Sequence, residues 1–380
     1  MAKAAIKNIK IIASNLVNWF LVHQRALPWR ETRDPYRIWI SEVMLQQTQV
    51  ATVIPYYLRF LKRFPTVESL ARAPLDDVLI LWSGLGYYSR ARNLHRGAQM
   101  VVERFAGKIP TSRPLIREIP GIGEYTAGAV LSIAYGLPEA LVDGNVSRVL
   151  SRMFLIKGDG RKGTAKESTW TLARQLVAAC HHPGNLNQAL MELGATICSP
   201  GAPDCGLCPL KSHCMARKLG VQGDYPEPPQ KAKVPIWNLR AWIVERGESV
   251  LLLQRQPKGL FGGLWEVPTE RIRQDLRLEA WGLNCRAVPQ ASSPKPQASF
   301  HLSHTLSHRL LHIEVCHADK MNLPADYFHP ETFSCWSGQY TGARWVKPAV
   351  VLDGGQIGVS SIQKKIIQAF RLSSKLVQTS

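Results

Sequence analysis

The feature that most constrains this chain is a loop that packs four cysteines into 17 residues. A turn-forming stretch, Ser-Pro-Gly-Ala-Pro-Asp, separates the first thiol from the second. Four thiolates at this density suit either a tetrahedral zinc ion or a [4Fe–4S] cluster. Zinc sites usually pair two Cys-x-x-Cys motifs across a long spacer, whereas this loop has one such motif. Four unrelated buried thiols are the third interpretation. The candidate ligands are Cys198, Cys205, Cys208 and Cys214.

The charge of the chain indicates a polyanionic partner. The 380 residues include 47 Lys and Arg against 28 Asp and Glu, which gives a formal net charge of +19. Such proteins bind nucleic acids by neutralising phosphates, although charge alone also fits a merely basic protein. The length predicts two or three domains, and a hydrophobic fraction of 45% excludes wholesale disorder.

The N-terminal segment imitates a signal peptide, but an amphipathic helix fits it better. Its apolar residues Ile9, Ile12, Leu16 and Phe20 recur at helical spacing, and no small-residue cleavage site follows. No segment has 18 uninterrupted apolar residues, so we expect no membrane span. We therefore expect a cytoplasmic protein, associated with the nucleoid in a bacterium, whose eight cysteines are thiols or ligands rather than disulfides.

The pattern of apolar residues changes once along the chain, from helical to strand-like spacing. Residues 1–222 show the apolar spacing of helices, punctuated by Gly and Pro. Residues 223–235 hold four prolines and predict a semi-stiff linker. Residues 236–372 contain strand-like runs and end in a basic amphipathic helix, and residues 373–380 form a tail. We therefore predict a multidomain protein with an all-α first domain and an α+β second domain.

Residues 113–133 predict two helices joined by the turn Pro-Gly-Ile-Gly, which is a helix-hairpin-helix. Gly121 and Gly123 allow a tight reversal and leave backbone N–H groups at a helix N-terminus, where they bind phosphate without sequence preference. Downstream, Asp143 precedes another amphipathic helix. A helix N-cap is the ordinary interpretation of such an aspartate.

Together and in this order, the hairpin, the Asp143 segment and the cysteine loop resemble the endonuclease-III-type DNA glycosylases, which carry a [4Fe–4S] cluster on this loop. Within that superfamily, three segments resemble the adenine DNA glycosylases of the MutY type. They are Leu-Pro-Trp-Arg at 27–30, Ile-Ser-Glu-Val-Met-Leu-Gln-Gln-Thr-Gln at 40–49 and Gly-Leu-Gly-Tyr-Tyr-Ser-Arg at 84–90. That family also has a Nudix-like domain after a linker, so the resemblance covers essentially the whole chain.

The resemblance implies a helix-hairpin-helix DNA glycosylase domain over residues 1–222, with the cluster loop at 198–214. It also implies a Nudix-like domain over residues 236–372 that recognises 8-oxoguanine. Bifunctional relatives, which also cut the DNA backbone, carry a Lys nucleophile in the second hairpin helix. Tyr125 stands at that position and cannot form a Schiff base, so we expect a monofunctional glycosylase.

Breaking a purine N-glycosidic bond requires an acid at the leaving base and a carboxylate for the cationic sugar. Glu42 lies within an apolar helix, where burial would raise its pKa and keep it protonated. By resemblance, Glu42 protonates adenine N7, Asp143 stabilises the sugar, and Tyr125 and Asn145 orient the centre. An exposed helical acid is the ordinary alternative for Glu42.

The target base must leave the DNA stack before it can react. In the family, the extruded adenine enters a pocket matching Trp29, Arg30 and Gln188, while residues matching Gln47 and Tyr87 wedge into the DNA near the lesion. Trp29 could instead be ordinary core, and Tyr87 could pack at a helix start. Contact with a DNA phosphate is our expectation for Arg90, although a solvated helix face is the ordinary alternative.

The C-terminal region resembles the approach to a Nudix box at residues 262–268, but residues 276–282 keep only Glu279 of the acidic set. A pyrophosphohydrolase needs several carboxylates on its metal ion, so we expect no nucleotide hydrolysis. By resemblance, the lesion-probing loop of the family, Phe-Ser-His, aligns with three residues here, the first of which departs from it. They are Leu306, Ser307 and His308.

The leading hypothesis is therefore a monomeric adenine glycosylase that acts on double-stranded DNA with adenine opposite 8-oxoguanine or guanine. The rival enzyme is a thymine or bifunctional pyrimidine glycosylase, against which Tyr125 and the Nudix-like domain argue. The second rival is a non-catalytic damage-binding protein, which the presence of Glu42 and Asp143 disfavours. The third is a Nudix hydrolase with a DNA-binding extension, which the missing acidic set disfavours.

Overall fold

The computed structural model describes residues 8–227, 234–257, 259–272, 300–306, 309–317, 340–353 and 357–378. Several predictions fall outside these ranges, and they concern Ser307 and His308, the remnant box at 276–282 and part of the linker at 223–235. None of the helices in the described ranges is long and apolar enough to cross a membrane.

The described chain separates into two compact units, each of which combines distant parts of the sequence. We call residues 1–72 and 93–231 the helical unit, and residues 73–92 and 232–380 the mixed unit. The segment 73–92 therefore packs with the C-terminal third of the chain, although it lies within the predicted helical domain.

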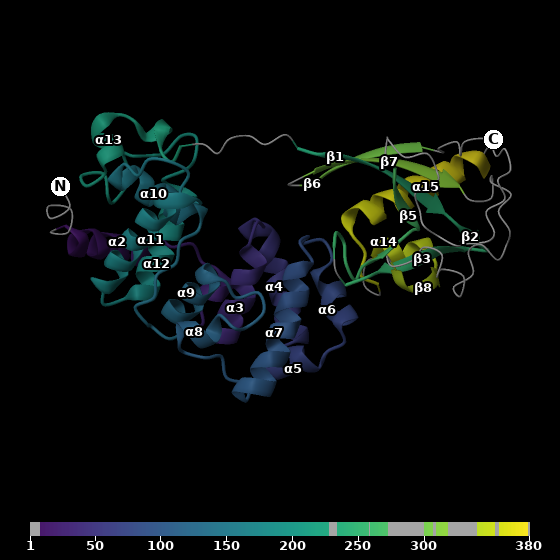
Figure 1. The fold of residues 1–380 in the computed structure, drawn as a ribbon, viewed down its shortest axis with the longest axis horizontal. Coiled ribbons are helices and arrows are strands. Elements are labelled where there is room, and N and C mark those ends of the chain that lie inside the picture. Colours follow the sequence, from purple (N-terminus) through teal and green to yellow (C-terminus); the bar gives the residue numbers. More distant parts are fainter. Residues whose placement is uncertain are drawn as a thin grey trace. The chain divides into compact units, whose positions relative to one another are not determined.

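The elements up to residue 227 are helical, as the apolar spacing predicts (Figure 1). They are α2 (Ile9–His23), η1 (Pro28–Arg30), α3 (Pro35–Leu45), α4 (Val50–Arg63), α5 (Val67–Arg72), α6 (Leu75–Trp82), α7 (Ser89–Phe105), α8 (Arg113–Ile116), α9 (Glu124–Ile133), α10 (Gly144–Phe154), α11 (Gly163–Ala178), α12 (Pro183–Thr196), α13 (Met215–Leu219) and η2 (Gln222–Asp224).

The core of the helical unit forms where α12 packs against α2, α9 and α10. The predicted amphipathic N-terminal helix is confirmed as α2, whose residues Leu16 and Phe20 are buried in this core. Leu150 of α10 and Leu190 of α12 meet them there. This packing fixes α9 and α10, the two helices whose N-termini carry the predicted hairpin and Asp143.

The described residues of the mixed unit form two β-sheets, one with the order β5-β1-β7-β6 and one in which β3 pairs with β2, β4 and β8. β1 and β7 run parallel, while the other pairings are antiparallel. Its elements are β1 (Ile236–Ile243), β2 (Glu245–Arg246), β3 (Ser249–Arg255), β4 (Trp265–Glu266), β5 (Thr269–Ile272), β6 (Phe300–Leu306), β7 (Arg309–His317), β8 (Tyr340–Val346), α14 (Pro348–Asp353) and α15 (Ser361–Gln378).

Helix α15 covers the first sheet with its apolar side, where Ile362 and Ile366 pack in one core with Leu311 and Ile313 of β7. The segment 73–92 is joined to this unit by hydrogen bonds. Ser83 Oγ donates to the carbonyl oxygen of Val359 at 3.0 Å, and the Gln254 amide donates to Asp76 at 3.2 Å. The loop that carries Tyr87 is therefore held by the C-terminal third of the chain.

We predict that Gly128→Ala lowers the free energy of unfolding by about 1–3 kcal/mol, because overpacking a closed site forces the backbone apart. Gly128 lies in α9, and a methyl group there would collide with the carbonyl oxygen of Ala140. Gly223→Ala is the control, because open space surrounds that glycine. Urea unfolding measures both variants, and equal midpoints would contradict the close approach.

Candidate active site

The centre of the site is a buried carboxyl group on α3. Asp34 caps this helix by accepting a hydrogen bond from the Tyr36 N–H, and Glu42 lies two turns further along with 4% of its surface exposed. The Tyr125 hydroxyl, at the start of α9, donates to Glu42 Oε2 at 2.5 Å. The same hydroxyl lies 3.3 Å from the sulfur of Met191.

Burial raises the pKa of Glu42 from 4.5 to about 7, although the hydrogen bond from Tyr125 acts in the opposite direction. The charge of Asp143 adds to the rise, and the charge of Arg30 opposes it. The pKa of Tyr125 lies well above 10, mainly because of burial and because Glu42 is near. Glu42 is thus able to hold and release a proton near neutral pH.

The second carboxyl group, Asp143, is the N-cap of α10, as the ordinary interpretation of its sequence suggests. Its Oδ1 accepts from the Val146 N–H at 2.7 Å, and its Oδ2 accepts from the Asn145 amide at 3.1 Å. Burial raises the pKa of Asp143, while these hydrogen bonds act to lower it. The carboxyl group of Asp143 thus lies at a helix N-terminus, where the helix dipole, like these hydrogen bonds, favours its negatively charged form.

A network of salt-bridged side chains involves Arg30 of η1. Glu192 of α12 is 1% exposed and pairs with Arg25 at 2.7 Å and with Arg30 at 2.8 Å. Burial acts to raise the pKa of Glu192, but the hydrogen bonds from both arginines outweigh it and lower the pKa to about 2. Glu192 is therefore ionised, and it fixes the guanidinium of Arg30.

The three residues predicted to hold the extruded base lie on two elements. Trp29 is 7% exposed and meets the Tyr57 ring edge-on at 5.5 Å between centroids. Gln188 is one turn of α12 before Met191 and Glu192, so these three share a helix face. Sequence reasoning missed Glu192 and Arg25. The signal for Glu192 was an acid within the apolar run of a helix, which is the same signal that identified Glu42.

The predicted hairpin has the expected form, with α8 and α9 joined by a short turn. Gly121 has φ +85°, a conformation that favours glycine, and a Cβ there would lie 2.9 Å from the Asn93 side chain. A Cβ at Gly123, the N-cap of α9, would meet nothing within 4 Å. Open space therefore lies beside the N-cap of α9, and the first N–H groups of a helix are the ones that can bind a phosphate.

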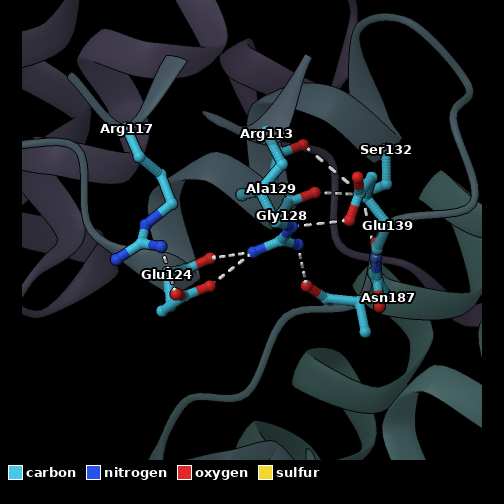
Figure 2. Close-up of polar contacts among 9 residues, drawn as sticks. Arg113, Arg117, Glu124, Gly128, Ala129, Ser132, Glu139 and Asn187 are labelled. Carbon is cyan, nitrogen blue, oxygen red and sulfur yellow. Dashed lines mark hydrogen bonds and ion pairs between the residues drawn. The ribbon is translucent and has the colours of Figure 1, made fainter. Parts of the chain in front are cut away.

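Arg113 holds this hairpin to the segment that leads to Asp143. Figure 2 shows its guanidinium between two carboxylates, Glu124 and Glu139, each at 2.7 Å. Its third nitrogen donates to the carbonyl oxygen of Ala140 at 3.0 Å. Asn187 of α12 donates to the carbonyl oxygen of Glu139 at 2.8 Å, so the helix that carries Gln188 joins the same network.

The two residues predicted to wedge into DNA share an unusual backbone conformation. Gln47 has φ +57° and Tyr87 has φ +47°, in the left-handed region that non-glycine residues rarely adopt. Both side chains are exposed, Tyr87 by 37%. Strained residues of this kind concentrate at functional sites, where surrounding structure maintains them.

Arg90 supports the Tyr87 loop from within the mixed unit. It is 8% exposed, and its guanidinium donates to the carbonyl oxygens of Leu85 and Gly86 at 3.1 and 3.2 Å. Burial lowers its pKa to about 10. This geometry gives Arg90 a role in holding the loop, and contact with a DNA phosphate stays a prediction.

A pocket of about 640 Å³, which we call the outer pocket, opens beside the Tyr87 loop within the mixed unit. Its walls include Tyr87 and Tyr88 on one side and Leu306, Arg309 and Phe261 on the other. The predicted lesion-probing residue Leu306 thus lines the same pocket as a predicted wedge residue. Its neighbours Ser307 and His308 lie outside the described residues.

The four loop cysteines line one small pocket, and none of them forms a disulfide. Arg152, which is 2% exposed, donates to Cys198 Sγ at 3.3 Å, and the Gln222 amide donates to Cys205 Sγ at 3.7 Å. Burial raises the pKa of the Cys208 thiol to about 11. Thiolates here would need positive charge from a bound metal group, and donors already face the sulfur atoms, so the set fits such a group.

The arrangement of these thiols also bears on which group they could hold. Among the described residues, no three Cys, His, Asp or Glu side chains are placed as ligands of a single metal ion. The four thiols line one small pocket together with Arg152 and Gln222. Arg148 joins this loop to the catalytic candidates, since it donates to the carbonyl oxygen of Cys198 at 2.8 Å and to Asn145 Oδ1 at 2.7 Å.

The chain is similar to known proteins in both its helical and its C-terminal region. Residues 40–175 match the HhH-GPD superfamily of base excision DNA repair proteins, and residues 240–369 match the NUDIX domain. The chain is 39% identical over 316 residues to the adenine DNA glycosylase of Rattus norvegicus, with 70% of this chain and 61% of the relative covered. It is 36% identical over 368 residues to that of Homo sapiens, with 82% and 67% covered.

The chain thus spans about six tenths of the length of the rat relative and two thirds of the human one. It is also similar to the solved structure of a thermostable thymine-DNA glycosylase, with 30% identity and a TM-score of 0.50. That match covers 56% of this chain and 98% of the other.

We predict that Tyr125→Phe raises the pKa of Glu42 above its wild-type value near 7, because the variant removes a hydrogen bond that favours the carboxylate. Tyr135→Phe is the control, since that hydroxyl donates to Ile109 elsewhere. Carboxyl carbon chemical shifts of labelled Glu, followed against pH by NMR, measure the change. An unchanged titration of Glu42 in Tyr125→Phe would show that the bond has no such effect.

Proposed function

Because the chain belongs to the adenine DNA glycosylases, within the HhH-GPD superfamily of base excision DNA repair proteins, we propose that it hydrolyses the N-glycosidic bond of adenine mispaired with 8-oxoguanine or guanine. The observation that carries the proposal is the buried Glu42, whose pKa is near 7, next to Tyr125 and the charge of Asp143. Two carboxyl groups in one site, one of them able to give up a proton, are what cleavage of a glycosidic bond requires.

Glu42 acts as the general acid. Near pH 7 a substantial fraction of this carboxyl is protonated, so it can give a proton to N7 of the adenine and make the base a better leaving group. Tyr125 orients the carboxyl through its hydroxyl, and its hydrogen bond also stabilises the carboxylate that remains after the proton has left.

Asp143 stabilises the positive charge that develops on the sugar, by transient covalent capture before water attacks. Two hydrogen bonds favour its carboxylate form and oppose the rise in pKa that burial causes, one from the N–H of Val146 and one from the amide of Asn145. Asn145 is itself held by Arg148, which restricts how Asp143 can turn. Because Tyr125 replaces the Lys nucleophile of bifunctional relatives, no Schiff base forms and the enzyme is monofunctional.

The adenine, flipped out of the helix, enters the pocket formed by Trp29, Arg30 and Gln188. Glu192 supports this pocket through its ion pair with Arg30, which lies across the apolar face of Phe20 with 5.1 Å between the guanidinium carbon and the ring centroid. An aromatic ring, a cation and an amide on rigid elements suit a flat base with polar edges.

The DNA backbone is held at the hairpin, by the N–H groups that follow Gly121 and Gly123, and the net charge of +19 favours such a polyanion. Gln47 and Tyr87 insert beside the mispair, with Arg90 supporting the second of them. We propose a cytoplasmic monomer that binds double-stranded DNA, associated with the nucleoid if it is bacterial.

The outer pocket of the mixed unit receives the 8-oxoguanine opposite the adenine. Leu306 supplies an apolar contact there, and Ser307 and His308 supply hydrogen bonds to the N7–H and 2-amino edge of the lesion. The absence of a Phe at position 306 removes a ring that could insert beside the lesion, so we expect lesion specificity with weaker affinity or search. The Nudix-like region does not hydrolyse nucleotides.

Cys198, Cys205, Cys208 and Cys214 would hold a [4Fe–4S] cluster, which would crosslink the loop from 198 to 214 through its four thiolates. Arg152 binds both a cysteine sulfur and the carbonyl oxygens of Ser199 and Pro200, and thereby joins the loop to α10. The residues of the chain thus fix the loop on the same helix that carries Asp143 as its N-cap.

We predict that wild-type protein converts a duplex with adenine opposite 8-oxoguanine into a product that hot alkali cleaves, and that Glu42→Gln slows this reaction roughly 10²- to 10⁴-fold. Above pH 7 the single-turnover rate should fall by about tenfold per pH unit, because the raised pKa of Glu42 means that its proton is lost there. Glu103→Gln, an exposed acid, is the control.

Two further experiments distinguish this proposal from the rival functions. A duplex with thymine opposite guanine tests the pyrimidine rival, and borohydride trapping tests the Schiff base of a bifunctional enzyme. Full activity in Glu42→Gln, excision of thymine in preference to adenine, or a trapped covalent complex would each refute the corresponding part of the proposal.

We predict that the purified protein has a broad visible absorbance band from the cluster, which a zinc protein lacks because Zn²⁺ is d¹⁰. Cys208→Ser should lose most of the band, whereas Cys180→Ser should keep it, because Cys180 does not line the cysteine pocket. A colourless wild-type protein with one zinc ion per chain would contradict the cluster and show that the four cysteines bind zinc.

A further inference from the structure

The hydroxyl group of Tyr125 lies between two acceptors of very different strength. It donates to Glu42 Oε2 at 2.5 Å, and its oxygen is 3.3 Å from the sulfur of Met191 on α12. A tyrosine hydroxyl has one hydrogen, so it can serve only one of these acceptors at a time. A carboxylate is a strong acceptor and a thioether sulfur is a weak one, so the hydrogen goes to Glu42.

The packing of α12 against α9 brings Met191 to this hydroxyl. Met191 lies three residues after Gln188, so it shares a face of α12 with the residue that we place beside the flipped adenine. The side chains of Met191, Gln188 and Tyr125 are all half-buried, so solvent reaches this side of α12. Met44 and Met153 are buried, with 0% and 2% of their surfaces exposed. A small solute can therefore reach Met191 more readily than these two methionines.

Oxidation of the sulfur would remove the difference between the two acceptors. Hydrogen peroxide transfers one oxygen atom to a thioether, which loses two electrons, while the O–O bond of the peroxide breaks and water is released. The sulfoxide is polar, and its oxygen is a stronger acceptor than the thioether sulfur. An oxygen atom added to the sulfur of Met191 comes within reach of a hydroxyl group that is 3.3 Å from that sulfur.

We propose that Met191 is a modification site at which peroxide moves the hydrogen bond of Tyr125 from Glu42 to a methionine sulfoxide and thereby slows the excision of adenine. The inference rests on the proposed function, in which Glu42 gives the proton to the base. Without the donor that stabilises its carboxylate, Glu42 gives up that proton less readily. Enzymatic reduction of the sulfoxide restores the thioether, so the modification is reversible.

The other groups that act on Glu42 keep their charges when Met191 is oxidised. They are Asp143, at the N-cap of α10, and Arg30 of η1. The sulfoxide has no net charge, so it acts through the hydrogen bond alone. Loss of a bond that favours the carboxylate raises the pKa of Glu42 further above its value near 7, which moves the alkaline fall of the rate to higher pH. The rate below that pH falls as well, because the carboxylate that remains lacks its donor.

Peptide mass spectrometry of the full-length protein after treatment with hydrogen peroxide tests the modification. Met191 should be oxidised at a dose that oxidises Met215, which is 40% exposed, while Met44, which is 0% exposed, stays reduced. In the same sample the titration of Glu42, followed by NMR of labelled carboxyl carbons, should move to higher pH. Neither measurement uses DNA, so both can be interpreted if adenine excision fails. A reduced Met191, or an oxidised Met191 with an unchanged titration of Glu42, overturns the inference.

Single-turnover excision from the duplex with adenine opposite 8-oxoguanine tests the effect on the reaction, with each protein compared with its own untreated sample. Peroxide should slow the wild type about tenfold or more, the effect of losing a hydrogen bond to a charged group. Methionine sulfoxide reductase should restore the rate. Met191→Leu, which has no sulfur at this position, should keep its own rate after treatment.

Met100→Leu is the matched control, because Met100 is a half-buried methionine of α7 that does not contact Tyr125. Its reaction should be slowed by peroxide as that of the wild type is. Equal losses of activity in Met191→Leu and the wild type would assign the effect to another residue and refute the proposed site.

Met191→Gln tests the competition without any oxidant. Its amide oxygen is an acceptor on a side chain of similar length, so it should reproduce the oxidised state, with a slower reaction and a higher pKa of Glu42. Met191→Leu is again the control, since it changes the side chain without adding an acceptor. Equal titrations of Glu42 in Met191→Gln and Met191→Leu would show that an acceptor at this position does not draw the hydroxyl away.

Discussion

The hydrogen bond between the Tyr125 hydroxyl and Glu42 is the contact on which the site depends, because it joins α3 to α9 across the interior. Burial makes the proton on Glu42 hard to lose, and the hydroxyl partly offsets this effect, so the pKa settles near neutrality. The bond can form only where α9 lies deep in the helical unit. Gly128, which lets α9 approach the chain at Ala140, is part of what places it there.

Arginine side chains hold several of the residues around this centre in place, and each arginine has different partners. Arg113 ties the hairpin to the segment before Asp143, and Arg148 ties Asn145 to the cysteine loop. Arg30 is fixed by Glu192, which stays ionised because two guanidinium groups surround it. The planar fork of arginine binds several acceptors at once, which is why these junctions use it rather than lysine.

The mixed unit brings together two segments that lie far apart in the sequence. The segment 73–92 lies early in the sequence, yet its Ser83 and Asp76 bond to the C-terminal third. The loop that carries the strained Tyr87 is therefore held in place by hydrogen bonds to the C-terminal third of the chain. Its outer pocket combines that loop with Leu306, a residue more than 200 positions further along.

The sequence alone determined the helices, the hairpin glycines and the acids Glu42 and Asp143, because helical spacing, turn residues and capping are local properties that a few neighbours decide. Only the tertiary structure decided which side chains meet across the chain. Arg25 and Glu192 are 167 residues apart, and no local pattern pairs them. Arg90 looks like a surface charge in sequence, yet the fold buries it beneath a loop, since burial depends on what packs above a residue.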